Sequence, residues 1–154
     1  MNQSSKKNAI PKGWERKKIK DLLVFERPDK YIVKSTHYTA SGKTPVLTAN
    51  KSFIKGYTDE DFGICNKLPV IIFDDFTTDS KYVDFPFKVK SSAMKLLRPK
   101  NDQVSLRFVY EKMKSIDFPR GNHKRYYISQ YQNLNVLTPS FPEQKRITGF
   151  ISSV

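Results

Sequence analysis

Cysteine is nearly absent from this sequence. Cys65 is the only one among 154 residues, which excludes an internal disulfide and argues against a zinc site built from cysteines. Long apolar runs are also missing. No segment reaches membrane-spanning length, and residues 1–13 are polar and basic, unlike a secretory signal. We therefore expect a cytoplasmic protein without a membrane partner, and we expect neither a metal nor a cofactor.

Acidic residues are scarce relative to basic ones. The chain has 15 Asp and Glu against 28 Lys and Arg, which gives a formal net charge of +13. Such an excess favours a polyanionic partner, because each phosphate that a protein neutralises releases condensed counterions. The alternative is that some of these lysines only keep the protein soluble. Hydrophobic residues make up 38% of the chain, including 11 Phe and 8 Tyr, which is enough for a folded core.

The order of apolar patterns predicts an α/β (α+β) fold in a single domain. Residues 1–10 are expected to form a flexible leader, and a helix is expected after Trp14 because Ile19, Leu22 and Leu23 share one face. Residues 70–73 are continuously apolar, as in a central strand that is covered on both faces. We expect a mixed, twisted sheet with flanking helices, and its other strands should lie near residues 44–48, 87–90, 94–97 and 135–137.

Two further helical patterns follow the strands. The first should be capped by Asn101 or Asp102 and should bury Leu106, Val109, Tyr110 and Met113 on one face. The second should start near Pro142, since proline is favoured at a first helical position. A helix of about three turns is marginal in water on its own, so its apolar stripe should pack on the domain or on a partner helix, a second copy included. This stripe consists of Ile147, Phe150, Ile151 and Val154.

Three segments, in this order, carry a family resemblance. They are residues 11–15 (Pro-Lys-Gly-Trp-Glu), residues 73–93 with their Phe-Asp-Asp-Phe and Val-Asp-Phe-Pro-Phe stretches, and residues 134–147 with a Pro-Glu-Gln motif. Together they resemble the target recognition domain in the specificity subunit of type I restriction–modification systems. The resemblance covers about residues 11–154.

The resemblance implies a non-catalytic module that reads DNA. A specificity subunit of this family is similar to two such domains separated by two long helices in an antiparallel coiled coil, and each domain reads one part of a bipartite site. Methyltransferase subunits that modify adenines dock on this scaffold, and a motor–nuclease subunit joins for cleavage. The resemblance thus implies double-stranded DNA, these two subunits, and a second recognition domain or a self-dimer as partners.

By the same resemblance, residues 11–140 form the recognition domain and residues 141–154 begin a truncated spacer helix. The chain departs from the family pattern because it carries one domain and only a short helix. We expect a truncated chain, a natural half subunit or one product of a split gene. The short helix puts stable docking of a methyltransferase subunit in doubt.

A basic loop near residue 120 is the first candidate for contact with DNA. Arginine can pair with O6 and N7 of guanine, and asparagine can pair with N6 and N7 of adenine. The alternative is a solvated loop that meets only phosphates or nothing. The candidate residues are Arg120, Asn122, His123, Lys124, Arg125 and Tyr126.

Two further groups are candidates for DNA contact. Lys88 and Lys90 are two strand positions apart, about 6.6 Å on one face, which could match neighbouring phosphates; an ordinary solvated sheet face is the equal alternative. Loops that leave a rigid sheet are common places for recognition residues. The loop candidates are Asn50 and Lys51 in one loop and Thr77, Thr78 and Lys81 in another.

Other functions fit the sequence less well. Asp61 followed by Asp79-x-Lys81 has the outline of a Mg²⁺-dependent nuclease, but the pattern is short and common in a charged chain. A basic RNA-binding protein also fits the charge. A methyltransferase is disfavoured because the chain lacks a Gly-rich strand-to-helix turn and any Asn-Pro-Pro-Tyr type sequence.

The positive charge generates a first testable prediction. If about 4–6 phosphates are neutralised on binding, the logarithm of the affinity for duplex DNA should fall with the logarithm of the salt concentration at a slope of about −4 to −5. Titrations at several salt concentrations measure this slope. A slope near zero would contradict binding through phosphates.

Overall fold

The fold is built on a central antiparallel sheet of four strands in the order β2-β8-β5-β6. The structure is a computed structural model that describes residues 9–119 and 124–152, the last three of these by backbone alone. The strands are β2 (Leu23–Glu26), β5 (Val70–Asp74), β6 (Ser80–Val83) and β8 (Met94–Pro99). All five residues of β5 are buried, which confirms the prediction of a central strand covered on both faces.

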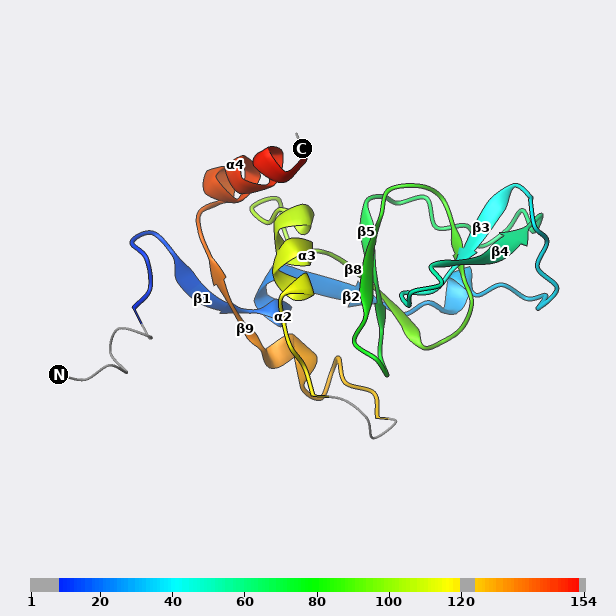
Figure 1. Ribbon diagram of the computed structural model, residues 1–154, viewed down its shortest axis with the longest axis horizontal. Coiled ribbons are helices and arrows are strands. Elements are labelled where there is room, and N and C mark those ends of the chain that lie inside the picture. The colour runs from blue at the N-terminus through cyan, green and yellow to red at the C-terminus, as the bar shows by residue number, and fades with distance from the viewer. Residues whose placement is uncertain (1–8, 120–123, 153–154) are drawn as a thin grey trace.

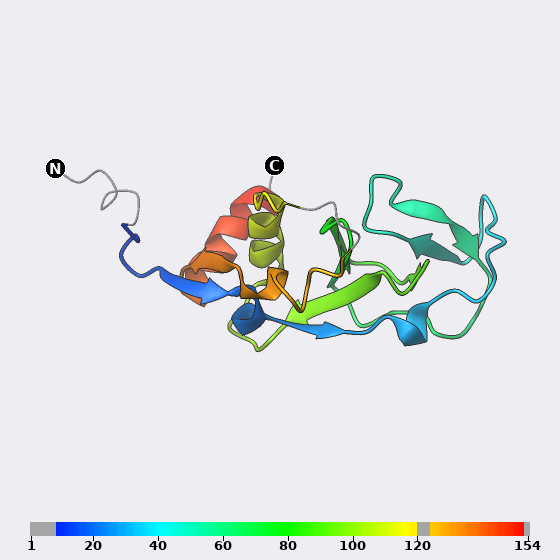
Figure 2. The same ribbon diagram turned by 90° about the horizontal axis from the view of Figure 1, so that it is seen from below.

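Two hydrophobic clusters cover the two faces of this sheet. Because side chains alternate along a strand, Ile71 and Phe73 point into one cluster and Val70 and Ile72 into the other. The first cluster packs under the helices, and the second packs under a smaller sheet. Figures 1 and 2 show the resulting three layers, with the helices on one side of the central sheet and β3 and β4 on the other.

The helical layer combines helices with a two-stranded ribbon. The ribbon pairs β1 (Glu15–Lys18) with β9 (Asn135–Thr138). Two of the helices, α3 (Leu106–Lys114) and α4 (Phe141–Ser152), pack against each other. This layer also contains the short elements α2 (Ile19–Leu22) and η2 (Tyr131–Asn133). Trp14 is partly buried against the first cluster.

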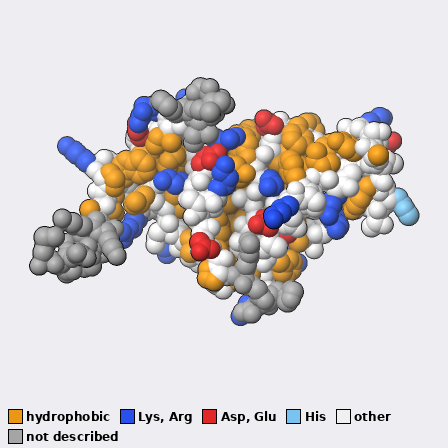
Figure 3. Space-filling model, viewed as in Figure 1, with side chains coloured by type: hydrophobic (Ala, Val, Ile, Leu, Met, Phe, Trp, Pro, Cys, Tyr) orange, Lys and Arg blue, Asp and Glu red, His pale blue; other side chains and the backbone are white. Residues whose placement is uncertain are grey.

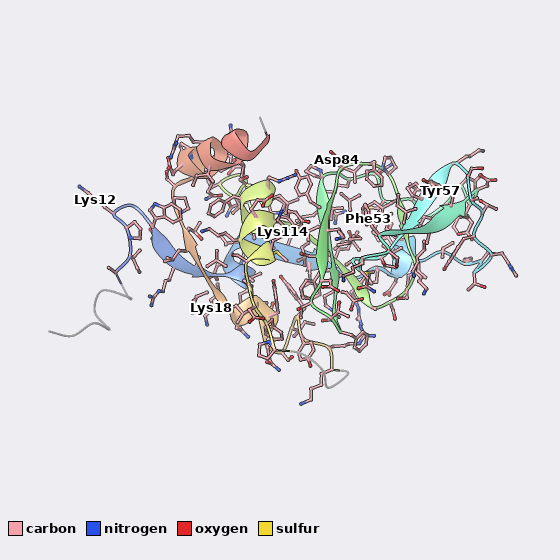
Figure 4. All side chains as sticks on the ribbon, viewed as in Figure 1. Lys12, Lys18, Phe53, Tyr57, Asp84 and Lys114 are labelled. Carbon is pink, nitrogen blue, oxygen red and sulfur yellow. The ribbon has the colours of Figure 1, made fainter. Side chains whose placement is uncertain are left out.

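The smaller sheet has the order β4-β3-β7 and is mixed. Strand β3 (Thr44–Leu47) runs antiparallel to β4 (Ile54–Thr58) and parallel to β7 (Lys88–Val89). A one-turn segment, η1 (Asp29–Tyr31), precedes this sheet in the chain. The side chains of Phe53 and Phe85 pack against the second cluster, and Figure 4 places Phe53 between the central sheet and the smaller one.

The structure confirms the α/β (α+β) class and corrects some of its details. The strands are divided among three sheets, where we expected one. The expected helix after Trp14 is wrong for residues 15–18, which form β1, and only one helical turn follows. The reason is tertiary, because β1 pairs along its whole length with β9.

Both later helices are confirmed, but the predicted cap is wrong. Ser105 caps α3 by accepting a hydrogen bond from the backbone N–H of Phe108 at 3.2 Å, so neither Asn101 nor Asp102 does so. Helix α4 begins one residue before Pro142, as predicted. Within the described residues, no helix combines the length and apolar character that crossing a bilayer requires.

Candidate nucleic-acid interface

Four segments that are distant in sequence meet at one end of the central sheet. We call them the turn cluster and define it as residues 50–51, 76–78, 90–93 and 124–125. Thr77 Oγ1 donates to Asn50 Oδ1 at 3.4 Å, and Arg125 Nη1 donates to the backbone oxygen of Ser92 at 3.2 Å. The turn between β5 and β6 and the segment after residue 123 both lie at the lower side of Figure 1. Most of the loop residues selected from the sequence are therefore neighbours.

The buried side chain of Asp75 connects the segments of the turn cluster through hydrogen bonds. It is 1% exposed, and its Oδ1 accepts hydrogen bonds from the backbone N–H groups of Tyr126 (3.1 Å) and Tyr127 (2.8 Å). Its Oδ2 accepts a hydrogen bond from Lys95 Nζ at 2.5 Å. Its backbone N–H donates to the oxygen of Ala93 at 2.8 Å. One buried carboxylate thus joins the β5–β6 turn, the start of β8 and the segment after residue 123.

The guanidinium of Arg125 is exposed but held in place. Its side chain is 51% exposed, and Nη1 lies 3.6 Å from Asp75 Oδ2. The guanidinium carbon also lies 4.9 Å from the ring centroid of Phe76, a cation–π contact. Within the described residues its hydrogen bonding uses Nη1, and Nε and Nη2 donate to none of these residues.

The β5–β6 turn has a fixed backbone. Asp74 Oδ1 accepts hydrogen bonds from the N–H groups of Phe76 (2.8 Å) and Thr77 (3.0 Å). Thr78 adopts a left-handed conformation with φ of 62°, which is rare for a β-branched residue. The backbone at Thr77 and Thr78 is therefore set by the protein itself.

A small basic groove adjoins the turn cluster. It has a volume of about 220 Å³, and it contains three cationic side chains and one carboxylate. Lys51, Lys90 and Lys124 of the turn cluster are exposed as well. The lining residues of the groove are Arg27, Pro28, Asp29, Ser92, Lys95, Arg125 and Ile128.

Three predicted contact residues lie elsewhere or are covered. Tyr126 is 3% exposed and packs edge-on against Phe118, which makes it part of the scaffold. Lys81 lies on β6, where it lines a separate depression of about 460 Å³ beside the end of α3. The prediction that Lys88 is a surface lysine on a half-exposed strand is wrong, because its side chain is fully buried.

The buried charge of Lys88 is paired with Glu60, which lies in the loop after β4. Its Nζ lies 2.8 Å from Glu60 Oε1, donates to the backbone oxygen of Phe62 at 2.7 Å and lies 4.0 Å from the centroid of the Phe62 ring. With the ammonium paired in this way, Lys88 has no free charge to offer a phosphate. Lys90 remains exposed, so the two lysines do not form a pair on one solvated face.

Several predicted residues lie outside the described part of the chain. These are Arg120, Asn122 and His123 of the basic loop and Val154 of the terminal stripe, together with the side chains of Phe150 and Ile151. Ile147 is described, and it packs partly buried against the first cluster. Among the side chains of α4 that are described, the buried ones are Gln144 and Thr148, and Gln144 Oε1 accepts from the backbone N–H of Ser105 at 2.9 Å.

The basic side chains are not confined to the turn cluster. Figure 3 shows Lys and Arg at several places on the visible face, some of them beside Asp or Glu. Figure 4 places Lys12 and Lys18 near the β1 ribbon and Lys114 on α3. The described part of the chain contains no group of three or more His, Cys, Asp or Glu residues that could hold a metal ion.

Sequence reasoning missed Asp75, Lys95 and Arg27. Lys95 is a lysine inside a strand whose other residues are mostly apolar, and a buried lysine requires a carboxylate partner. That signal indicates a buried ion pair, but it does not identify Asp75 as the partner. Arg27 has no comparable signal, since only the folded chain brings it to the groove.

Comparison with known proteins decides the family. A family model described as "Type I restriction modification DNA specificity domain" matches residues 11–154. The chain belongs to this family. As a specificity domain it is a non-catalytic module of a restriction–modification system.

Relatives of this specificity domain are longer than the chain. It is 46% identical over 124 residues to the EcoR124I/EcoR124II specificity subunit of Escherichia coli, covering 77% of this chain and 31% of that protein. The S subunit from M. genitalium matches with a TM-score of 0.62 at 17% identity, over 92% of this chain and 38% of that one. A chain from work on assembly and conformational transition of the type I R-M system matches with a TM-score of 0.65 at 14% identity, over 94% and 39%. The chain therefore spans about a third of the length of these relatives, and the solved structures support its fold.

The buried carboxylate of the specificity domain generates a stability prediction. Asp75→Ala should lower the free energy of unfolding by about 3–5 kcal/mol, because it leaves the largely buried Lys95 without its partner. Chemical denaturation measures the loss. The double variant Asp75→Ala/Lys95→Met should recover part of it, since no unpaired charge remains. An unchanged stability in Asp75→Ala would contradict the anchoring role of this carboxylate.

The Glu60–Lys88 pair generates a pH prediction. The hydrogen bond from Lys88, followed by that from the backbone N–H of Ser35, lowers the pKa of Glu60 from 4.5 to about 2. A depressed carboxyl pKa contributes stability above about pH 4.5, and this contribution disappears as the pH falls towards 2. Glu60→Gln should therefore be less stable than the wild type at neutral pH and should lose less stability between pH 4.5 and 2.

Unfolding curves at several pH values test this prediction. Glu15→Gln is the matched control, because Glu15 is exposed on β1, in a different layer from the Glu60–Lys88 pair. Parallel pH profiles for Glu60→Gln and the wild type would contradict the prediction.

Proposed function

We propose that this chain is a sequence-specific DNA-binding module that reads one half of a bipartite target for a type I restriction–modification complex. The observation that carries the proposal is the turn cluster, in which polar and basic loops meet at one end of a sheet whose central strands, β5 and β8, are buried. A rigid scaffold with side chains held at fixed positions suits recognition of base edges, because little conformational entropy is then lost on binding. Membership of a DNA specificity family supports the same conclusion.

Within the turn cluster we assign different tasks to different side chains. Arg125 is the base reader, because Ser92, Asp75 and Phe76 hold its guanidinium while Nε and Nη2 remain available for a bidentate contact with guanine. Lys51, Lys90 and Lys124 are exposed and suit phosphate contacts, which set the register of the protein on the duplex without specifying sequence. Asn50, Thr77 and Thr78 supply further hydrogen-bonding groups beside Arg125.

The partner proteins in this proposal are the methyltransferase and motor–nuclease subunits. The E. coli relative is named a specificity subunit of a type I restriction enzyme, and a structural neighbour comes from work on assembly of the type I R-M system. A specificity module that only reads DNA requires such subunits for any chemistry. Helix α4 is the element that would continue into a spacer and join this module to a second recognition domain, or to another copy through its apolar stripe.

The competing functions find less support in the structure. Asp79, one carboxylate of the nuclease outline, belongs to the β5–β6 hairpin, where its backbone oxygen accepts from Asp74 N at 2.9 Å and its own N–H donates to Thr77 Oγ1. Asp79 and Lys81 both line the depression beside α3, but Asp61, the other carboxylate of the nuclease outline, is not among its lining residues. The basic charge alone would suit RNA as well as DNA, so RNA duplexes and RNA single strands are compared with DNA in the binding experiment.

Arg125→Ala is the variant that tests base reading. Binding selection from randomised DNA duplexes first identifies a preferred sequence. On that sequence, Arg125→Ala should weaken binding by about 1–3 kcal/mol, since a bidentate contact with a base is lost. On random duplexes the variant should bind nearly as well as the wild type. Arg16→Ala is the control, because Arg16 is exposed on β1, in a different layer of the molecule.

Two outcomes of the Arg125→Ala experiment would change the assignment. An equal loss on preferred and random duplexes would make Arg125 a phosphate contact. A library that enriches no sequence, or tighter binding of RNA than of DNA, would overturn the proposed function itself.

A further inference from the structure

Ile128 is the most exposed large hydrophobic residue in the described part of the chain. Its exposed fraction is 56%, against 46% for Val24 and Phe62. Single exposed apolar side chains are common on protein surfaces and by themselves indicate nothing. Ile128 differs from an isolated case in its surroundings, because it lines the basic groove together with Arg27, Lys95 and Arg125.

The backbone around Ile128 is fixed by hydrogen bonds. The N–H groups of Gln130 and Tyr131 donate to the oxygen of Tyr126 at 3.0 and 2.8 Å, and Gln132 Nε2 donates to the oxygen of Ile128 at 3.0 Å. The preceding residue, Tyr127, is 1% exposed and packs edge-on against Phe73. This turn therefore holds Ile128 at the groove, and the side chain cannot turn into the core without breaking it.

The groove combines an apolar group with positive charge. Asp75 already pairs with Lys95, so the positive charge of the groove comes from Arg27 and Arg125 against the single carboxylate of Asp29, which favours a polyanion over a cationic partner. Ile128 requires an apolar counterpart on that polyanion. In the major groove of duplex DNA the C5-methyl group of thymine is the apolar feature of the base edges, and apolar side chains recognise thymine through it.

We propose that Ile128 is a specificity-determining residue that contacts the C5-methyl group of a pyrimidine in the target, next to the base that Arg125 reads. The inference rests on the proposed function, because it requires that the turn cluster enters the major groove. Thymine and 5-methylcytosine both carry this methyl group, and the test separates them. Arg125 and Ile128 together would read neighbouring bases, one through hydrogen bonds and the other through apolar contact.

The experiment uses the full chain and the duplex enriched from a randomised library. Each thymine in turn is replaced by deoxyuridine, which removes only the methyl group, and each cytosine is replaced by 5-methylcytosine, which adds one. For the wild type we expect one position at which the methylated base binds about four-fold more tightly, the effect of burying one methyl group. A response to deoxyuridine assigns the contact to thymine, and a gain with 5-methylcytosine assigns it to that base.

Ile128→Ala should abolish this preference for the methyl group, and Ile128→Val should retain most of it. Val24→Ala is the matched control, since Val24 is 46% exposed but lines a different depression with Glu26 and Arg98. Thermal unfolding of the variants should match the wild type, because Ile128 is largely outside the core.

The outcomes separate this inference from the proposed function. If a sequence is enriched but Ile128→Ala discriminates between the methylated and unmethylated base as the wild type does, the assignment of Ile128 is overturned and the proposed function stands. The assignment is also overturned if no position responds to the methyl group, which would point to a protein partner as the cover for Ile128. If no sequence is enriched, the proposed function fails and the inference with it.

Discussion

The buried carboxylate of Asp75 fixes the geometry of the turn cluster, which we propose as the DNA-binding end of the molecule. Burying Asp75 is unfavourable unless its charge and its lone pairs are all matched, and Lys95, Tyr126 and Tyr127 together provide that match. The arrangement forms only when β5, β8 and the segment after residue 123 are all in place. The geometry of the turn cluster is therefore coupled to the folding of the central sheet.

Ion pairs between neighbouring segments also occur within each of the two larger sheets. Lys88 and Glu60 connect β7 to the loop after β4, and Arg98 on β8 donates to Glu26 on β2 at 2.6 Å. In each case a cation lies on a strand and its carboxylate belongs to another segment. Such pairs contribute modestly to net stability compared with an apolar core, but they penalise incorrect pairing of these segments, because a misplaced partner leaves a buried charge unpaired. We attribute the defined positions of these segments relative to the strands to these ion pairs.

The sequence predicted those strands and helices whose residue pattern lies within one short segment. Residues 70–73 were identified by an unbroken β-branched run, and α3 by its helical period, because each pattern reflects burial along one short segment. Residues 15–18 were misassigned because their strand exists through pairing with β9, which lies more than a hundred residues later. Lys88 was predicted to be exposed because alternation of apolar and polar residues along a strand implies one solvent-exposed face. In the structure its side chain is buried and pairs with Glu60. For the site, the loops could be chosen from composition, but their convergence on Asp75 depends on tertiary structure.

The three-layer arrangement separates the residues that keep the fold from the exposed turn residues that we propose for DNA contact. Exposed turn residues such as Lys51, Lys90 and Lys124 lie outside both hydrophobic clusters, so exchanging them leaves the interior packing intact, whereas the buried Asp75 cannot be exchanged in this way. Solved relatives retain this architecture at 14% and 17% identity. If the turn cluster reads DNA as we propose, this scaffold allows a change of target preference through a few surface substitutions while the free energy of unfolding changes little.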